Sequence, residues 1–325
     1  MGIFKRGLLL SLFVCVAATG ATAQARKPDI RIATGTPGGA YYVMGAVLAE
    51  ALNKSGRVNS ATAEASSGAI ESSRLMSSGE ITIGGMDAPL VIAGLRGQAP
   101  FKDKVSYLTV APLGYWALFF IGLESSNITS LEQIKGKRIA IGAKGSGMEA
   151  HARYFFNALG WSFDDIRPVY QAFGPGAAST REGKVDLQFQ CCIPNGGLTE
   201  LTELSRTRVV ATPPELLQKM LGTEGLYTQS ILKKGALRGH DTDLPVVSIQ
   251  IGWFAVPTLP EETAYIIMKT MLENIEQFAE RSPQYRSAKE LFDDARAKSQ
   301  PSLLEMGAPL HPGSVRAFRE AGIIK

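Results

Sequence analysis

The chain has 325 residues, of which 45% are hydrophobic and 20% charged, and its formal net charge is +4. This length suits one large domain or two medium ones. The lysines and arginines do not form the dense run that a nucleic-acid or membrane-surface patch needs, which argues against both kinds of partner. After the N-terminus the most apolar stretch is 107–123, and its proline and glycines argue against a membrane span.

The first 25 residues have the order of a secretory signal peptide. A short basic region precedes an apolar run at 7–18, and small residues follow with two A-x-A exits that end at Ala23 and Ala25. The run is too short to cross a bilayer as a helix. We therefore expect cleavage after Ala23 or Ala25 and a periplasmic mature protein. An uncleaved membrane anchor is the alternative.

The three cysteines do not predict a disulfide framework. Cys15 lies inside the apolar run of the signal peptide and is expected to be removed with it. Cys191 and Cys192 are adjacent, which is poor geometry for an ordinary disulfide. We predict two small, partly buried thiols on a strand. A strained, redox-active pair in an oxidising compartment is the alternative.

Strand-like and helix-like stretches alternate from residue 29 to about residue 210, after which a long strand and mostly helix follow. The expected strands are 29–34, 60–66, 81–86, 107–123, 138–141, 167–172, 185–190, 207–211 and 246–256. Such alternation predicts an α/β protein with largely parallel sheets.

Two of these strands are unusually long, one near residue 115 and one near residue 250, and they enclose a central block. This arrangement predicts that the chain leaves one lobe, builds a second and returns. We place lobe one at 26–118 plus 254–325 and lobe two at 119–253, with the two long strands crossing as a hinge.

Four strand-to-helix turns carry small or hydroxylated residues: 34–39 (TGTPGG), 66–68 (SSG), Asp87 and 145–147 (GSG). Each leaves backbone N–H groups free at the positive end of a helix dipole, where an anion can be held without arginine. In open α/β sheets these turns lie where ligand crevices form. Serine, threonine and aspartate are also ordinary N-caps. Taken together, the turns predict a small ligand that carries a carboxylate.

Tyr41 and Tyr42 follow the first of these turns. We expect one of them to wall the ligand pocket and the other to pack in the core or lie on the surface. Asp87, with Pro89 two residues later, favours a helix cap over contact with a ligand ammonium.

The sequence lacks the constellations of an enzyme. His151, His240 and His311 are far apart, and no HExxH, CxxC or GxSxG motif is present. Solvated or capping histidines are expected at 151 and 311. The loop 142–147 (GAKGSG) has neither dinucleotide spacing nor a P-loop GK[ST]. We predict a non-enzymatic monomer with no catalytic residue, no cofactor and no metal site.

Five stretches in order resemble the TAXI family, the solute receptors of TRAP transporters. They are 34–53 (TGTPGGAYYVMGAVLAEALN), 66–79 (SSGAIESSRLMSSG), 130–147 (SLEQIKGKRIAIGAKGSG), 233–245 (KKGALRGHDTDLP) and 308–324 (APLHPGSVRAFREAGII). Together they extend over nearly all of the mature chain.

The resemblance implies a type II periplasmic-binding-protein fold, TRAP membrane subunits driven by an ion gradient as partners, and a ligand such as glutamate, glutamine or 2-oxoglutarate. The site residues that it implies are Thr34, Gly39, Tyr42, Ser67, Gly68 and Asp87 on lobe one, with Ser146 and Gly147 on lobe two.

The strand 186–194 (DLQFQCCIP) departs from the family pattern. It is about one residue short and places Gln188 and Gln190 where small or aliphatic residues are usual. These glutamines are the next candidates on lobe two if Ser146 proves to be only a helix cap. Two other function classes remain: a binding module that feeds a sensor, which neighbouring genes would distinguish, and a secreted hydrolase, which would need a catalytic constellation.

Overall fold

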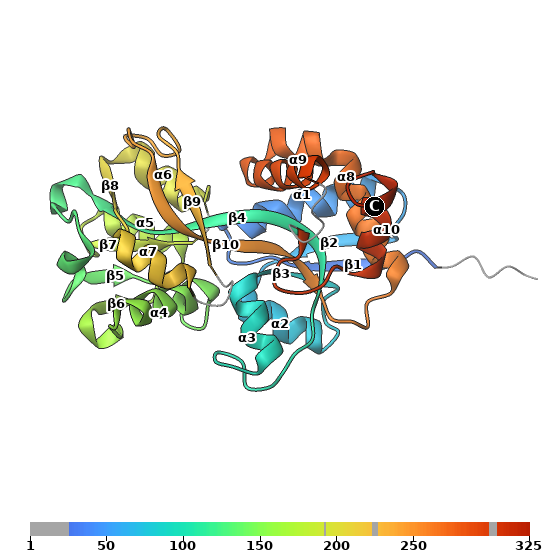
Figure 1. Ribbon diagram of the computed structural model, residues 1–325, viewed down its shortest axis with the longest axis horizontal. Helices are drawn as coiled ribbons and strands as arrows, with labels where there is room; N and C mark the ends of the chain where they lie inside the picture. The colour runs from blue at the N-terminus through green and yellow to red at the C-terminus, as the bar shows by residue number, and fades with distance from the viewer. Residues whose placement is uncertain (1–25, 192, 223–226, 299–303) are drawn as a thin grey trace, which may run out of the picture.

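The computed structural model describes residues 26–191, 193–222, 227–298 and 304–325. The predicted signal peptide and Cys192 lie outside this part of the chain. Two groups of elements stand apart in Figure 1, and two long strands run between them, β4 (Leu108–Leu123) and β10 (Leu244–Ala255). The predicted two-lobed α/β fold with a hinge of crossing strands is confirmed. The residue boundaries proposed for the two lobes stay a prediction.

The first lobe joins the N-terminal units to the C-terminal helices. Its elements are β1 (Asp29–Ala33), α1 (Ala40–Lys54), β2 (Ser60–Glu64), α2 (Ala69–Ser77), β3 (Ile83–Asp87), α3 (Ala88–Arg96), α8 (Glu261–Arg281), η4 (Pro283–Tyr285), α9 (Arg286–Lys298) and α10 (Pro312–Glu320).

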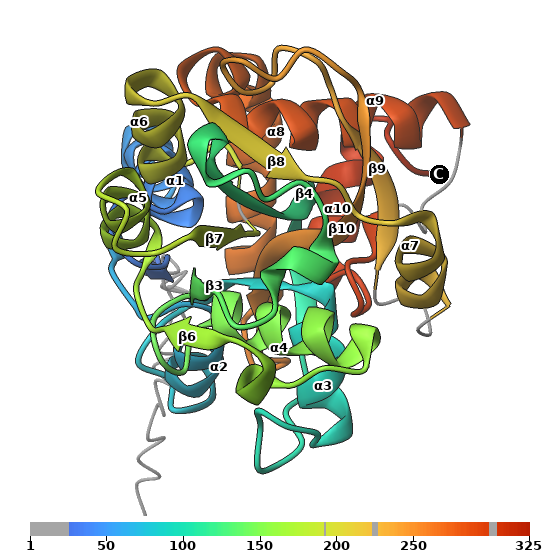
Figure 2. The ribbon, with the colours of Figure 1, turned by 90° about the vertical axis from the view of Figure 1, so that its left-hand side faces the viewer.

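The second lobe is built from the middle of the chain. Its elements are η1 (Glu124–Ser126), η2 (Leu131–Ile134), β5 (Arg138–Ala140), α4 (Gly147–Leu159), η3 (Phe163–Asp165), β6 (Arg167–Val169), α5 (Phe173–Arg181), β7 (Leu187–Gln190), α6 (Gly196–Leu204), β8 (Thr207–Val210), α7 (Pro214–Leu221) and β9 (Thr228–Leu232). In both ribbon views α5 and α6 lie on one side of β7 and α4 lies on the other (Figure 2).

The strand order is β2-β1-β3-β10-β4-β7-β5-β6, with β8 beside β4 and β9 beside β10. Strands β1, β2 and β3 pair in parallel, and so do β5, β6 and β7. Strands β4 and β10 run antiparallel to each other and to their other neighbours, among them β8 and β9. The prediction of largely parallel sheets is therefore wrong, and the sheets are mixed. The reason is that the chain crosses between the lobes twice, in opposite directions.

The burial of the two crossing strands explains why their sequences are so apolar. Almost every residue of β4 and β10 is buried, so both strands read as continuous apolar runs rather than as an alternating pattern. Helix α1 shows the contrasting pattern, since Met44, Val47, Leu48 and Leu52 form one buried stripe at helical spacing.

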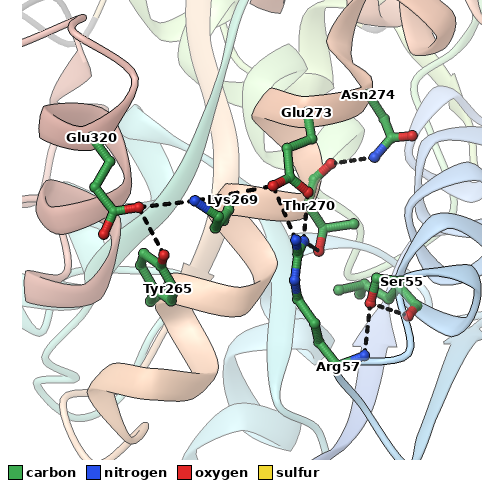
Figure 3. Close-up of polar contacts among 9 residues, drawn as sticks. Ser55, Arg57, Tyr265, Lys269, Thr270, Glu273, Asn274 and Glu320 are labelled. Atoms are coloured by element: carbon green, nitrogen blue, oxygen red, sulfur yellow. Dashed lines mark hydrogen bonds and ion pairs between the residues drawn. The ribbon is translucent and has the colours of Figure 1, made fainter.

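Surface ion pairs join α8 to its neighbours (Figure 3). Arg57, after α1, donates to Glu273 with Nη2 and Oε1 3.0 Å apart. Lys269 and Tyr265 both donate to Glu320 of α10, at 2.9 and 2.8 Å. Each exposed pair contributes at most about 1 kcal/mol, so this network adds little to the stability of the lobe.

Candidate functional site

A cavity of about 70 Å³ lies between the lobes and is lined by residues of both. Its walls are the first turns of α1, α2, α4 and α5, the cap of α3, and residues of the crossing strands. By the size of a water-sized probe it has room for roughly five water molecules. The site is therefore suited to a small solute.

All the predicted contact residues except Tyr42 line this cavity: Thr34, Gly39, Ser67, Gly68, Asp87, Ser146 and Gly147. Their proximity follows from the fold, because the ends of parallel strands meet at one edge of each lobe. That they contact a ligand stays a prediction.

Tyr41, not Tyr42, lines the cavity. The Tyr41 ring packs against Trp116 and Trp253, with ring centroids 4.6 and 5.2 Å apart, and its hydroxyl donates to the carbonyl of Met86. Tyr42 is 39% exposed. Consecutive residues of a helix point about 100° apart, so one tyrosine faces the cleft and the next faces away.

Several helices begin at the cavity without a side-chain cap. Among the described residues, the N-caps of α1, α2 and α5, which are Gly39, Gly68 and Ala172, make no side-chain capping bond. At α2 the two N–H groups before the helix are already bound, that of Gly68 by Oγ of Ser66 at 3.2 Å and that of Ser67 by Oε2 of Glu71 at 2.6 Å. Free N–H groups and the positive ends of helix dipoles therefore converge on one space. No lysine or arginine is found among the described residues of its lining.

Gly68 is required by its backbone. Its φ is +119°, in a region that residues with a side chain rarely adopt. A Cβ built at this position would lie 3.7 Å from the backbone N of Gly147, on the other lobe. The starts of α2 and α4 therefore face each other across the cavity.

Two helix starts are capped. The hydroxyl of Ser146 accepts the N–H of Glu149 at a long 3.3 Å, and Oδ1 of Asp87 accepts the N–H of Leu90 at 3.1 Å. Asp87 is therefore a helix cap, as the sequence favoured, and it also lines the cavity.

His151 is a site residue that the sequence reasoning missed. Its Nε2 lies 3.1 Å from Oδ2 of Asp87, on the other lobe, and both side chains are buried. The expectation of a solvated or capping histidine is wrong here. The spacing could have indicated it, because His151 lies four residues after Gly147 and shares its helix face.

Gln188 and Gln190 do not line the cavity. Their amides form a buried chain in which Gln188 donates to the carbonyl of Phe173 at 2.9 Å, Gln190 to Gln188 at 2.9 Å, and Asn195 to Gln190 at 3.0 Å. Since Phe173 does line the cavity, this chain fixes the start of α5 from behind.

The lobes touch on several sides of the cavity. The N–H of Gly196 donates to the carbonyl of Gly38 at 3.2 Å, the hydroxyl of Tyr154 to Ala99 at 2.9 Å, and the amide of Gln284 to Pro194 at 2.9 Å. The molecule is therefore in a closed arrangement.

Over the described ranges, no group of three or more metal-ligating side chains could hold an ion, and no helix is long and apolar enough to cross a membrane. Cys191 is buried at the cavity wall, just after β7.

Solved structures share this fold. A protein of Bordetella bronchiseptica RB50 is 13% identical over 91% of this chain and 98% of its own, with a TM-score of 0.57. One described as a periplasmic transporter is 15% identical over 82% and 96%, with a TM-score of 0.52. A putative sulfonate ABC transporter periplasmic sulfonate-binding protein of Methylobacillus flagellatus KT is 16% identical over 92% and 96%, with a TM-score of 0.50.

At such identities the likeness is one of fold, that of the type II periplasmic binding proteins. The class of protein defined by this fold and its interlobe cavity is the solute-binding receptor, which is not an enzyme. The chain belongs to the NMT1-like family, which it matches over residues 32–322.

The family match corrects the resemblance to the TAXI family, and with it the expectation of TRAP membrane subunits as partners. The stretches behind that resemblance are mostly glycine turns and helix starts. Every strand-to-helix unit facing a cleft needs such a turn, so these stretches follow from the fold and do not distinguish one transporter type from another.

Proposed function

We propose that this protein is the extracytoplasmic receptor of an ABC-type importer and that it binds a small anion carrying a carboxylate between its lobes. The importer type is supported by the NMT1-like family and by the sulfonate ABC transporter component among the solved structures with this fold. The predicted signal peptide agrees with an extracytoplasmic location.

The observation that carries the anion proposal is the convergence of uncapped helix starts on one cavity. The first turns of α1, α2 and α5 present backbone donors that no N-cap side chain accepts. Such donors hold carboxylates and related oxyanions. Asp87 is the one acidic residue among the described residues of the lining, and it occupies the start of α3, so the uncapped starts are left for a solute.

Binding can be tested by thermal shift. A ligand that binds only the folded protein stabilises it by about 2.7 kcal/mol at a hundredfold excess over its dissociation constant. A suitable panel is pyruvate, succinate, L-glutamate, 2-oxoglutarate, methanesulfonate and taurine, with glucose and adenosine as uncharged controls. We expect at least one carboxylate to raise the melting temperature by several degrees. A response to the controls alone would contradict the anion proposal, and a response to sulfonates alone would replace the carboxylate.

The importer type has a separate test. Uptake of the bound solute should stop with vanadate, which blocks ATP hydrolysis by ABC importers, and should survive brief treatment with a protonophore. The reverse result would contradict the proposed partner while leaving the binding site untouched. Intact-mass analysis of periplasmic material checks the export prediction, which a mature chain that starts at Met1 would contradict.

A further inference from the structure

The buried contact between Asp87 and His151 has no explanation in helix capping alone. Asp87 ends β3 on the first lobe, and His151 belongs to α4 on the second. Nε2 of the histidine and Oδ2 of the aspartate are 3.1 Å apart, and the histidine side chain is only 1% exposed. The ring is therefore enclosed between the lobes, at the wall of the cavity.

The polar atoms of the His151 ring are incompletely satisfied. The contact with Asp87 is close, but it lacks the geometry of a hydrogen bond, and neither ring nitrogen has a hydrogen-bond partner among the described residues. Buried polar atoms in native proteins nearly always have partners, and leaving one unpaired is costly. Because Nε2 faces Asp87, Nδ1 is the ring nitrogen that can bond to a solute in the cavity.

The other ionisable groups near the ring add no positive charge. Burial raises the pKa of the Tyr154 and Tyr227 hydroxyls, and the negative charge of Asp87 adds to the effect, so both tyrosines are neutral. Helix α7, which packs on α4, carries Glu215 and Lys219 on its exposed face. The packed strand β7 has no charged residue.

The charged residues of α4 itself near the ring are Glu149 and Arg153. They pair with each other at 2.8 Å. The charge that His151 meets inside the cavity is therefore that of Asp87 and of the solute.

We propose that His151 is a ligand-contacting residue that determines specificity, with Nδ1 donating to the bound anion while Nε2 faces Asp87. This inference rests on the proposed function. Both neighbours of the ring would then be acceptors. An imidazole donates from both nitrogens only in its protonated form. A ring that is neutral in the free protein must therefore take up one proton when the anion binds.

The coupling has a definite sign. If the bound protein holds one more proton than the free protein, the affinity for the anion rises as the pH is lowered, by at most tenfold per pH unit. A neutral solute of similar shape gains nothing from this proton and is discriminated against.

The first measurement observes the ring directly. Protein labelled with ¹⁵N in its histidine rings is compared at pH 7.5 without solute and with each panel anion that raises the melting temperature. His151→Gln assigns the signal. We expect a neutral ring without solute and the imidazolium pattern with a bound anion. Calorimetric titration in two buffers of different ionisation enthalpy should show uptake of about one proton.

The second measurement uses variants. His151→Gln keeps an amide near the position of Nε2, facing Asp87, but cannot titrate. We expect its affinity for the same anion to fall roughly 10- to 150-fold, as for the loss of a hydrogen bond to a charged group, and its affinity to lose the pH dependence. The matched control is His240→Gln, outside the cavity, which should leave both unchanged.

The outcomes separate the two proposals. If no panel anion stabilises the wild-type protein, the anion proposal fails and this inference fails with it. If an anion binds while the His151 ring stays neutral, or if His151→Gln binds it within about twofold of wild type at every pH, the role of His151 is refuted and the proposed function stands.

Discussion

Replacing Ser146 with alanine separates a ligand contact from a helix cap. The Ser146 hydroxyl accepts the N–H of Glu149 and lies at the cavity wall. A hydroxyl can accept one hydrogen bond and donate another, so it can cap α4 and bind a carboxylate at the same time. The two roles have different magnitudes and are measured by different experiments.

The structure sets the size of each effect. The capping bond is long, at 3.3 Å, so its loss should cost about 0.5–1 kcal/mol of stability, near the low end for N-caps. Loss of a hydrogen bond to a bound carboxylate costs about 1.5–3 kcal/mol, which is roughly 10- to 150-fold in affinity.

The assay is calorimetric titration with the solute identified by mass spectrometry of the purified protein, together with urea unfolding of the solute-free protein. The matched control is Ser162→Ala. Ser162 caps η3 on the same lobe by accepting the N–H of Asp164 at 3.1 Å, and it is not part of the cavity wall. The control should lose a little stability and keep its affinity. If Ser146→Ala behaves in the same way, the serine is only a cap and the reasoning about α4 is refuted.

Three further predictions concern stability. Gly45→Ala should destabilise the protein, because the new Cβ would lie 2.2 Å from Cγ2 of buried Thr34. This clash should outweigh the roughly 1 kcal/mol by which helices favour alanine over glycine. A free energy of unfolding in urea at least equal to that of the wild type would contradict this. Gln190→Ala should cost roughly 2–5 kcal/mol, since it removes the donor to Oε1 of Gln188 and the acceptor of the Asn195 amide, both of them buried. A loss of stability below about 1 kcal/mol would contradict this. Burial lowers the pKa of His311, so the unfolded state binds the proton at a higher pH than the folded state does. Stability should therefore fall as the pH drops below about 6.5. His311→Asn should flatten that decline, and an equal decline in the variant would show that other groups cause it.

Much of the architecture could be predicted because its signals are local. Glycine turns and hydroxyl residues mark where strands end and helices begin, and this placed the starts of α1, α2, α3 and α4 correctly. Long apolar runs marked the two crossing strands, because a strand buried on both faces needs apolar residues at every position. The meeting of these helix starts at one cavity followed from the rule that parallel strands end at one edge.

The tertiary structure decided whatever depends on partners distant in the sequence. The direction of β4 and β10 follows from the two crossings between lobes, which no local pattern records. Tyr41 faces the cleft because its ring packs against Trp116 and Trp253. The role of His151 in the site depends on its contact with Asp87, which lies 64 positions earlier in the sequence and on the other lobe. Side-chain periodicity tells which face of a helix is buried, but only packing tells what that face meets.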